Sequence, residues 1–218
     1  MTRPGPAIVP LGEGAWTVVL GNRVDRELHR RVTALASRIG AAGLHGLIEV
    51  VPAYAAVTVF FEGDAEAFRA RLAPLCDLDP AHLPGRGEVA AARLHTIPVS
   101  YAGPDLDHVS RETGLSREEI IRRHSAPEYV VYLLGFAPGF GYLGDLDPAL
   151  VLPRRASPRT RVPAGSVAIA GAQTAVYPLA TPGGWHLIGS TTLRMFDPAR
   201  EPAALLAAGD RVRFEPSA

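Results

Sequence analysis

The feature that most constrains the fold is the stretch from Tyr129 to Thr191, where short apolar runs alternate with turns rich in glycine and proline. Both residues are favoured where a chain turns sharply, and glycine also allows another group to approach the backbone closely. Short strands separated by such turns are typical of a small β-barrel or sandwich. Because these turns also carry aromatic, arginine and glutamine side chains, they are the best candidate for a binding or catalytic surface.

The segments around this stretch give the order of elements in the second half of the chain. A strand is expected at residues 94–101, followed by a helical stretch at 104–125 in which Ser116 and Glu119 have the spacing of a capping box. Further strands are predicted at residues 129–134, 166–170, 174–177, 185–188, 193–196 and 211–214.

The first 76 residues predict a different arrangement, in which helices pack on a small sheet. Strands are expected at residues 15–20, 47–51 and 55–61, and helices begin after the capping residues Asp25 and Asp64. Apolar residues recur at helical spacing after Asp25, at Leu28, Val32, Leu35 and Ile39. The sequence therefore predicts an α+β protein with a small N-terminal α/β domain over 1–76, a linker rich in proline and glycine over 77–92, and a second domain over 93–218.

Composition excludes several functional classes. The chain has 218 residues, is 47% hydrophobic and has a formal net charge of zero, so it can bury a core and is a poor candidate for nucleic-acid binding. All 22 basic residues are arginine, which excludes a lysine nucleophile or a Walker lysine. The single cysteine, Cys76, is expected to be a buried, inert thiol. The N-terminus lacks the apolar run of a signal peptide and no membrane span is apparent, so we expect a cytoplasmic protein.

The segment Gly135–Tyr142 follows an apolar strand and combines three glycines with three aromatic residues. Its backbone N–H groups could receive an anion, and its rings could enclose an apolar or planar group. A tightly packed corner of a barrel would use the same residues equally well.

Four arginines fall within eight residues, at Arg154, Arg155, Arg159 and Arg161. The planar fork of arginine suits bidentate capture of carboxylate or phosphate. In an extended segment Arg159 and Arg161 point the same way and could converge on one anion, with Pro163 close behind them. A solvated loop is the alternative, and it is the commoner outcome for a cluster of charges.

Other polar residues in the same half give weaker indications. Gln173 and Thr174 could orient a polar ligand or form a turn between two strands. His186 follows a flexible turn and is a candidate general base, although a half-buried histidine is the more frequent outcome. His124 ends the helical stretch, where the helix dipole favours a charged imidazole, and it is the second candidate catalytic residue. The histidines show no metal-ligand spacing, and no P-loop or nucleophile elbow occurs.

Taken together, the motifs EYVVYLLGFAPGFGYLGDLD, PRTRVPAGSVAIAGAQTAVYPL and TPGGWHLIGST resemble the PxpB/KipI family. This family comprises the B subunit of 5-oxoprolinase, also called allophanate hydrolase subunit 1 or carboxyltransferase domain, subdomain C and D. The segments PLGEGAWTVVLG and LIEVVPAYAAVTVFF agree with it, so the resemblance covers nearly the whole chain.

The resemblance implies that the second domain is a cyclophilin-like β-barrel. It also implies a direct partner, the C subunit (PxpC/KipA-like), and a further one, the A subunit (PxpA/LamB-YcsF-like). Together they would use ATP, with Mg, to open 5-oxo-L-proline to L-glutamate, with no cofactor held tightly by this chain alone. By the same resemblance the binding surface comprises Gly135, Phe136, Pro138, Gly139, Tyr142, Arg159, Arg161, Pro163, Gln173, Pro182, Gly183 and Trp185.

The sequence departs from the family pattern at two positions. Gly141 stands where the family usually has proline, and Ser190 stands where it usually has arginine. The first change loosens a loop and the second removes a possible contact to an anion. A KipI-like regulatory protein that inhibits a sensor histidine kinase by binding it is the alternative function.

Overall fold

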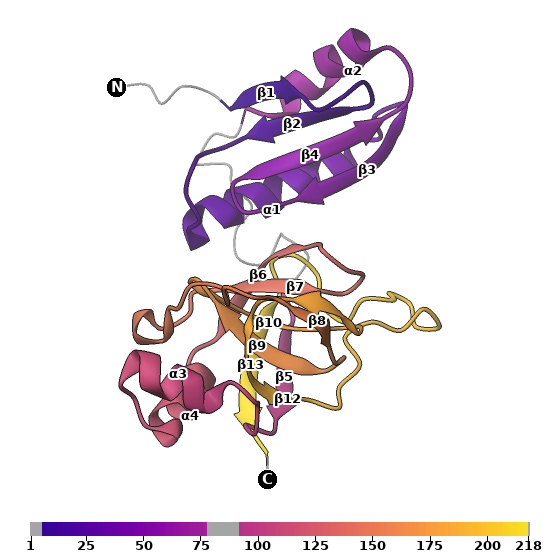
Figure 1. Ribbon diagram of the computed structural model, residues 1–218. Coiled ribbons are helices and arrows are strands. Elements are labelled where there is room, and N and C mark those ends of the chain that lie inside the picture. The colour runs from indigo at the N-terminus through magenta and orange to yellow at the C-terminus, as the bar shows by residue number, and fades with distance from the viewer. Residues whose placement is uncertain (1–5, 78–91, 218) are drawn as a thin grey trace, which may run out of the picture. The chain divides into compact units, whose positions relative to one another are not determined.

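A computed structural model of the chain describes residues 6–77 and 92–217 (Figure 1). The chain divides between Ala92 and Arg93 into two compact units, and each unit has a hydrophobic core of its own. Most of the predicted linker, residues 77–92, lies outside the described residues.

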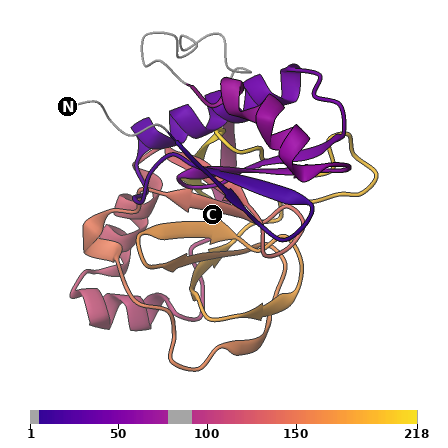
Figure 2. The same ribbon diagram turned by 90° about the horizontal axis from the view of Figure 1, so that it is seen from above.

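The N-terminal unit is a four-stranded antiparallel sheet in the order β1-β2-β4-β3, with helices on one face (Figures 1 and 2). Its elements are β1 (Ala7–Pro10), β2 (Ala15–Val19), α1 (Arg26–Ala41), β3 (Leu47–Pro52), β4 (Ala56–Phe61), α2 (Ala65–Leu72) and the 3-10 turn η1 (Ala73–Leu75). The Asp25 carboxylate accepts a hydrogen bond from the backbone N–H of Leu28, 2.8 Å away, and this caps α1.

The core of this unit follows the helical periodicity of the sequence. Val32, Leu35 and Ile39 of α1 are fully buried against the sheet, as predicted. Cys76 is also buried, and burial raises the pKa of its thiol to about 11, which keeps it in the unreactive protonated form. The prediction that Cys76 is buried is therefore confirmed, and its inertness stays a prediction.

The C-terminal unit is built on a seven-stranded sheet in the order β12-β9-β10-β7-β6-β13-β5. Neighbours are antiparallel except β13 and β5, which are parallel. Its strands are β5 (Leu94–Val99), β6 (Tyr129–Leu134), β7 (Gly141–Gly144), β8 (Arg159–Val162), β9 (Ser166–Ala170), β10 (Gln173–Val176), β11 (Thr181–Gly183), β12 (His186–Ser190) and β13 (Arg211–Pro216). Strands β8 and β11 form a separate two-stranded ribbon.

The sheet curls until its two edges meet. Directly after β5, Ser100 exchanges two backbone hydrogen bonds of 2.9 Å with Ser190 at the end of β12. Closure of a sheet into a barrel removes the unpaired edges that an open sheet would expose. The predicted α+β class with a barrel in the second half is thus confirmed.

The helical stretch before β6 is two helices, α3 (Leu106–Thr113) and α4 (Arg117–Ser125), which pack on β12 and β13 respectively (Figure 1). Gly114 separates them with a left-handed φ of 70°. The Ser116 hydroxyl accepts a hydrogen bond from the Glu119 N–H at 3.2 Å, so the predicted cap of α4 is present.

The prediction of a strand at residues 193–196 is wrong. Only Phe196 makes an isolated bridge there, to Ala204. Conversely, strands β7, β8 and β11 lie in segments for which the sequence predicted loops. The first of these begins and ends in glycine and the second is half arginine, so neither shows the alternation that identifies a strand.

His124 lies in the core of the barrel unit, fully buried and stacked on Phe214. The Thr174 hydroxyl donates to the Ala168 carbonyl at 3.0 Å, so it must accept from His124 Nε2 at 2.8 Å. Nδ1 then accepts from the Tyr101 hydroxyl at 2.6 Å. Burial lowers the pKa of His124 to about 3, so the expectation of a charged imidazole at the helix end is wrong.

Gly103 provides a test of how the barrel closes. A Cβ at this position would lie 2.4 Å from both the Ile188 carbonyl carbon and the Leu187 oxygen, which are rigid backbone atoms of β12. We expect Gly103→Ala to destabilise the barrel by about 2–3 kcal/mol. The measurement is urea unfolding followed by Trp185 fluorescence in a Trp16→Phe background.

The matched control is Gly40→Ala in α1, where an added Cβ meets nothing within 4 Å. Alanine is the better helix former, so this variant should gain about 0.5–1 kcal/mol in the N-terminal unit, read by Trp16 fluorescence in a Trp185→Phe background. An unchanged midpoint for Gly103→Ala would contradict the close crossing over β12.

His124 predicts a pH dependence of stability. Its folded-state pKa lies below the unfolded value of about 6.5, so its neutral form favours the folded state above pH 6.5. That contribution is lost as the pH falls from 6.5 toward 3, by up to about 1.4 kcal/mol per pH unit. The free energy of unfolding, measured at several pH values, should lose this slope in His124→Gln and keep it in the exposed control His45→Gln. Equal slopes in all three proteins would refute the assignment.

Candidate functional site

The loop between β6 and β7 lines an open hollow of about 340 Å³ through residues 134–139. Phe136 stands out in it, because its side chain is 62% exposed and its φ is +71°. A left-handed backbone is unfavourable for a residue with a bulky side chain and persists only where its surroundings impose it. Gly139 shares the left-handed region, and a Cβ there would meet the Phe196 Cβ and the Met195 backbone at 2.8–3.3 Å.

Phe136 covers a cluster of rings that we call the aromatic cluster. Its members come from distant parts of the sequence and are Phe136, Phe140, Tyr142, Tyr177 and Trp185. Their ring centroids lie 4.9–6.5 Å apart in edge-to-face contacts, which are the favourable geometry for aromatic pairs. The structure therefore brings the predicted loop 135–142 together with the predicted turn before Trp185.

Phe140 contacts the four other rings of this cluster, and Gly183 leaves room for Tyr177. A Cβ on Gly183 would lie 2.3 Å from the Tyr177 hydroxyl oxygen. Burial raises the pKa of Tyr177, against the opposing effects of a hydrogen bond from the Trp185 backbone and the charges of Arg154 and Arg159. The phenol thus joins the rings on one side to the arginines on the other.

The arginine segment is organised around one carboxylate. Oδ1 of Asp105 accepts from Nη1 of Arg155 at 2.9 Å and from Nη2 of Arg159 at 2.7 Å. The Asp105 side chain is only 4% exposed, against 31% for Arg155 and 23% for Arg159. We call Arg155 and Arg159 the arginine pair.

Asp105 is ionised in this setting. Burial by itself would raise the pKa of its carboxyl group. The hydrogen bonds from Arg159 and the Leu187 N–H, with the charges of both arginines, outweigh burial and hold that pKa below its ordinary value.

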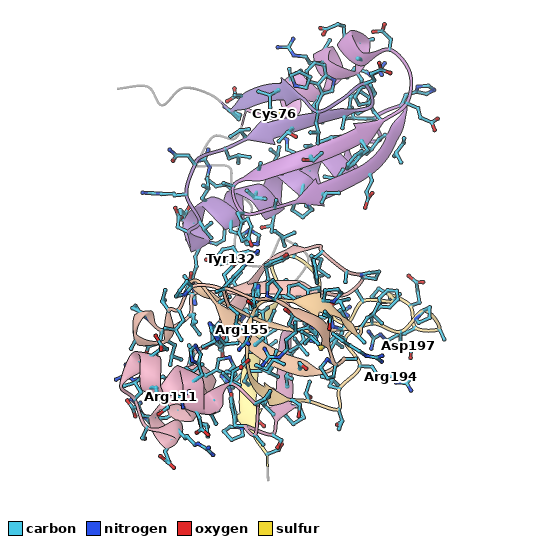
Figure 3. The ribbon with its side chains drawn as sticks, viewed as in Figure 1. Cys76, Arg111, Tyr132, Arg155, Arg194 and Asp197 are labelled. Carbon is cyan, nitrogen blue, oxygen red and sulfur yellow. The ribbon has the colours of Figure 1, made fainter. Side chains whose placement is uncertain are left out.

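The arginine pair differs from the pair that the sequence suggested. Arg159 and Arg161 lie on the short strand β8, but Arg159 is bound to Asp105 while Arg161 is exposed. Arg155 joins Arg159 instead, and Figure 3 labels its side chain. Asp105 was not predicted from the sequence because it lies about fifty residues before these arginines and outside every motif. No local sequence pattern indicates which residues it pairs with.

The candidate base His186 is buried, with 3% of its surface exposed. Its Nε2 donates to the Pro153 carbonyl at 2.8 Å, and its ring stacks on His108 with the ring centroids 5.1 Å apart. The other candidate, His124, is held inside the barrel as described above and has no exposed surface. A catalytic role for either histidine stays a prediction.

The remaining predicted residues lie in two places. Pro138 and Pro182 are both exposed. Pro138 lies in the loop that lines the hollow, and Pro182 lies on β11. Gln173 and Thr174 pair with Gly144 and Leu143, at the end of β7 away from the hollow, and Thr174 is fully buried.

Three further positions have structural surroundings of their own. The carbonyl of Pro163 accepts from the Ser166 hydroxyl at 2.8 Å. Gly141 is buried at the start of β7, where a Cβ would approach Leu206 at 3.0 Å. Ser190 forms the bridge that closes the barrel, so its backbone has a structural role whatever its side chain does.

The described residues contain no group of three or more His, Cys, Asp and Glu side chains that could hold a metal ion. Over the same residues, no helix has the length and apolar character needed to cross a bilayer.

The chain is similar to proteins of a known family. The family model described as carboxyltransferase domain, subdomain C and D, matches residues 6–206. The B subunit of 5-oxoprolinase from Escherichia coli O157:H7 is 44% identical over 212 residues, covering 94% of each chain. The protein of the same name from Bacillus subtilis (strain 168) is 40% identical over 227 residues, covering 95% of this chain and 91% of the relative.

Among solved structures, the crystal structure of TTHA0988 matches with a TM-score of 0.82 and 42% identity. The match covers 94% of this chain and 40% of that chain, so the present chain spans about two fifths of its length. These matches confirm the resemblance found in the sequence motifs. The chain belongs to the family of the carboxyltransferase domain, subdomain C and D.

Proposed function

We propose that this chain is the B subunit of an ATP-dependent 5-oxoprolinase, a cytoplasmic complex that opens 5-oxo-L-proline to L-glutamate together with the A and C subunits. The proposal rests on sequence identity to two relatives named as the B subunit of 5-oxoprolinase. The chain is 40–44% identical to them over nearly its whole length. No observation favours the alternative of a regulator that binds a histidine kinase.

The chemistry of the reaction suits the candidate site. A lactam is stabilised by resonance, so opening it at neutral pH requires activation of its carbonyl oxygen, which phosphorylation by ATP would supply. A site for such a reaction needs groups that hold anions and exclude water more than it needs a nucleophile. The arginine pair supplies positive charge, and Phe136 supplies an exposed apolar ring over the buried rings of the aromatic cluster.

The same geometry supports a protein that does not act alone. The described residues that line the hollow are Leu134 to Gly139, and none of them has a titratable side chain. We therefore assign ATP, with Mg, to the assembled complex and the binding of one reactant to this chain. The exposed ring of Phe136 suits a surface that a partner covers.

The first test concerns the arginines of β8. Replacing Arg159 and Arg161 together by alanine in the assembled complex should lower 5-oxoproline-dependent ATP hydrolysis about 100-fold, because a hydrogen bond to a charged group contributes about 1.5–3 kcal/mol. The control is Arg111→Ala on α3, which is exposed. Full activity of the double variant with intact assembly would remove these residues from the site.

The second test concerns the partners. The chain alone should show no 5-oxoproline-dependent ATP hydrolysis, and activity should appear when the A and C subunits are added. Phe136→Ser should weaken co-purification with the C subunit at least tenfold. The control Leu179→Ser should not weaken it, although Leu179 is also exposed, with 40% of its surface accessible. Absence of hydrolysis with all three proteins present would contradict the proposal.

A further inference from the structure

The arginine pair carries more positive charge than its carboxylate neutralises. Two guanidinium groups share Oδ1 of Asp105, so the three side chains together have a net charge of about +1. Within the described residues, no other carboxylate forms an ion pair with Arg155 or Arg159. Like charges held this closely repel each other, and a second anion would relieve the repulsion.

The three side chains are also held in place by the backbone around them. Oδ2 of Asp105 accepts from the Leu187 N–H at 2.7 Å, and the Asp105 N–H donates to the Leu187 carbonyl at 3.0 Å. The Arg155 N–H donates to the Gly184 carbonyl at 2.8 Å, while Arg159 is fixed by pairing of β8 with Gly183. The guanidinium groups are therefore preorganised rather than free in solvent.

The donors of this cluster are only partly used. Nε of Arg155 and Nη1 of Arg159 are buried and have no hydrogen-bond partner in the described chain. The same holds for Oγ1 of Thr181, on the strand paired with β8. A buried polar atom without a partner costs about 1–3 kcal/mol, so unpartnered atoms on neighbouring segments mark a place where a ligand or water supplies bonds.

We propose that the arginine pair is a binding site for an oxyanion and that Asp105 is its positioning residue. The ligand chemistry is a carboxylate on a small ring compound. A phosphate group offers the same acceptor oxygens and is the other source of that chemistry. The identity of the ring compound rests on the proposed function. In this site the partner of Arg159 is Arg155, in place of the Arg161 that the sequence suggested.

The first experiment uses the full chain with Trp16→Phe, so that fluorescence reports Trp185 alone, next to Gly184. Three probes are titrated: 5-oxoproline, the same ring without its carboxylate (2-pyrrolidone), and inorganic phosphate. We expect 5-oxoproline to bind at least tenfold more tightly than 2-pyrrolidone. Arg155→Gln and Arg159→Gln should each abolish that difference.

The phosphate arm separates the two sources of the anion. Competition between phosphate and 5-oxoproline supports one oxyanion site that accepts both. Binding of 5-oxoproline without competition assigns the site to a carboxylate. Equal affinity for 5-oxoproline and 2-pyrrolidone, or no effect of either arginine variant, would overturn the proposal.

Asp105→Asn tests positioning, with Asp107→Asn as the control because Asp107 lies in the first turn of α3, two residues after Asp105, with its side chain 58% exposed. In the assembled complex, Asp105→Asn should raise the KM for 5-oxoproline about tenfold and leave kcat within about twofold. A purely structural role would lower Tm and kcat and leave KM unchanged. If the variant does not fold, the two arginine variants still decide the binding site.

The sign of the effect is itself decisive. Loss of the Asp105 charge makes the site more positive, so tighter anion binding by Asp105→Asn would overturn the positioning role. Failure of the proposed function appears separately, because the fluorescence titration needs neither ATP nor a partner. Selective binding of 5-oxoproline by a chain whose complex hydrolyses no ATP would leave this inference standing and remove the function.

Discussion

The barrel unit depends on the hydrogen bonds that residues 100–105 make with the backbone of β12. Ser100 closes the sheet on Ser190, Gly103 donates to the Ile188 carbonyl, and Asp105 exchanges bonds with Leu187. This crossing requires glycine at 103, because any side chain would meet the backbone of the strand beneath. The same few residues therefore close the barrel and deliver a buried carboxylate to the place where the arginines arrive.

The aromatic cluster and the arginine pair are connected through that arrangement. The turn at Gly183 and Gly184 leads into β12, and it contacts Tyr177 on one side and the Arg155 backbone on the other. The turn therefore lies between the buried Tyr177 ring and the segment that carries Arg155.

The parts of the fold that could be predicted are those governed by local rules. The helix after Asp25 was predictable because its cap and the spacing of Leu28 and Val32 lie within one short segment. The ribbon that carries Arg159 was not, because two-stranded pairing of polar residues leaves no periodic apolar signal. The ion pairs of Asp105 depend on barrel closure, which joins residues about fifty positions apart and lies beyond any local pattern.

The absence of lysine from the sequence has a physical consequence at this site. A buried lysine can lose its proton and so remove its own charge, whereas a guanidinium group keeps its charge at every pH that a protein experiences. The planar fork also allows two arginines to share one carboxylate oxygen while each keeps other N–H groups for a ligand. Since the pKa of Asp105 is held below its usual value, the net charge of the cluster does not change across neutral pH. Any pH dependence of anion binding there must then come from the ligand or from groups outside the three side chains.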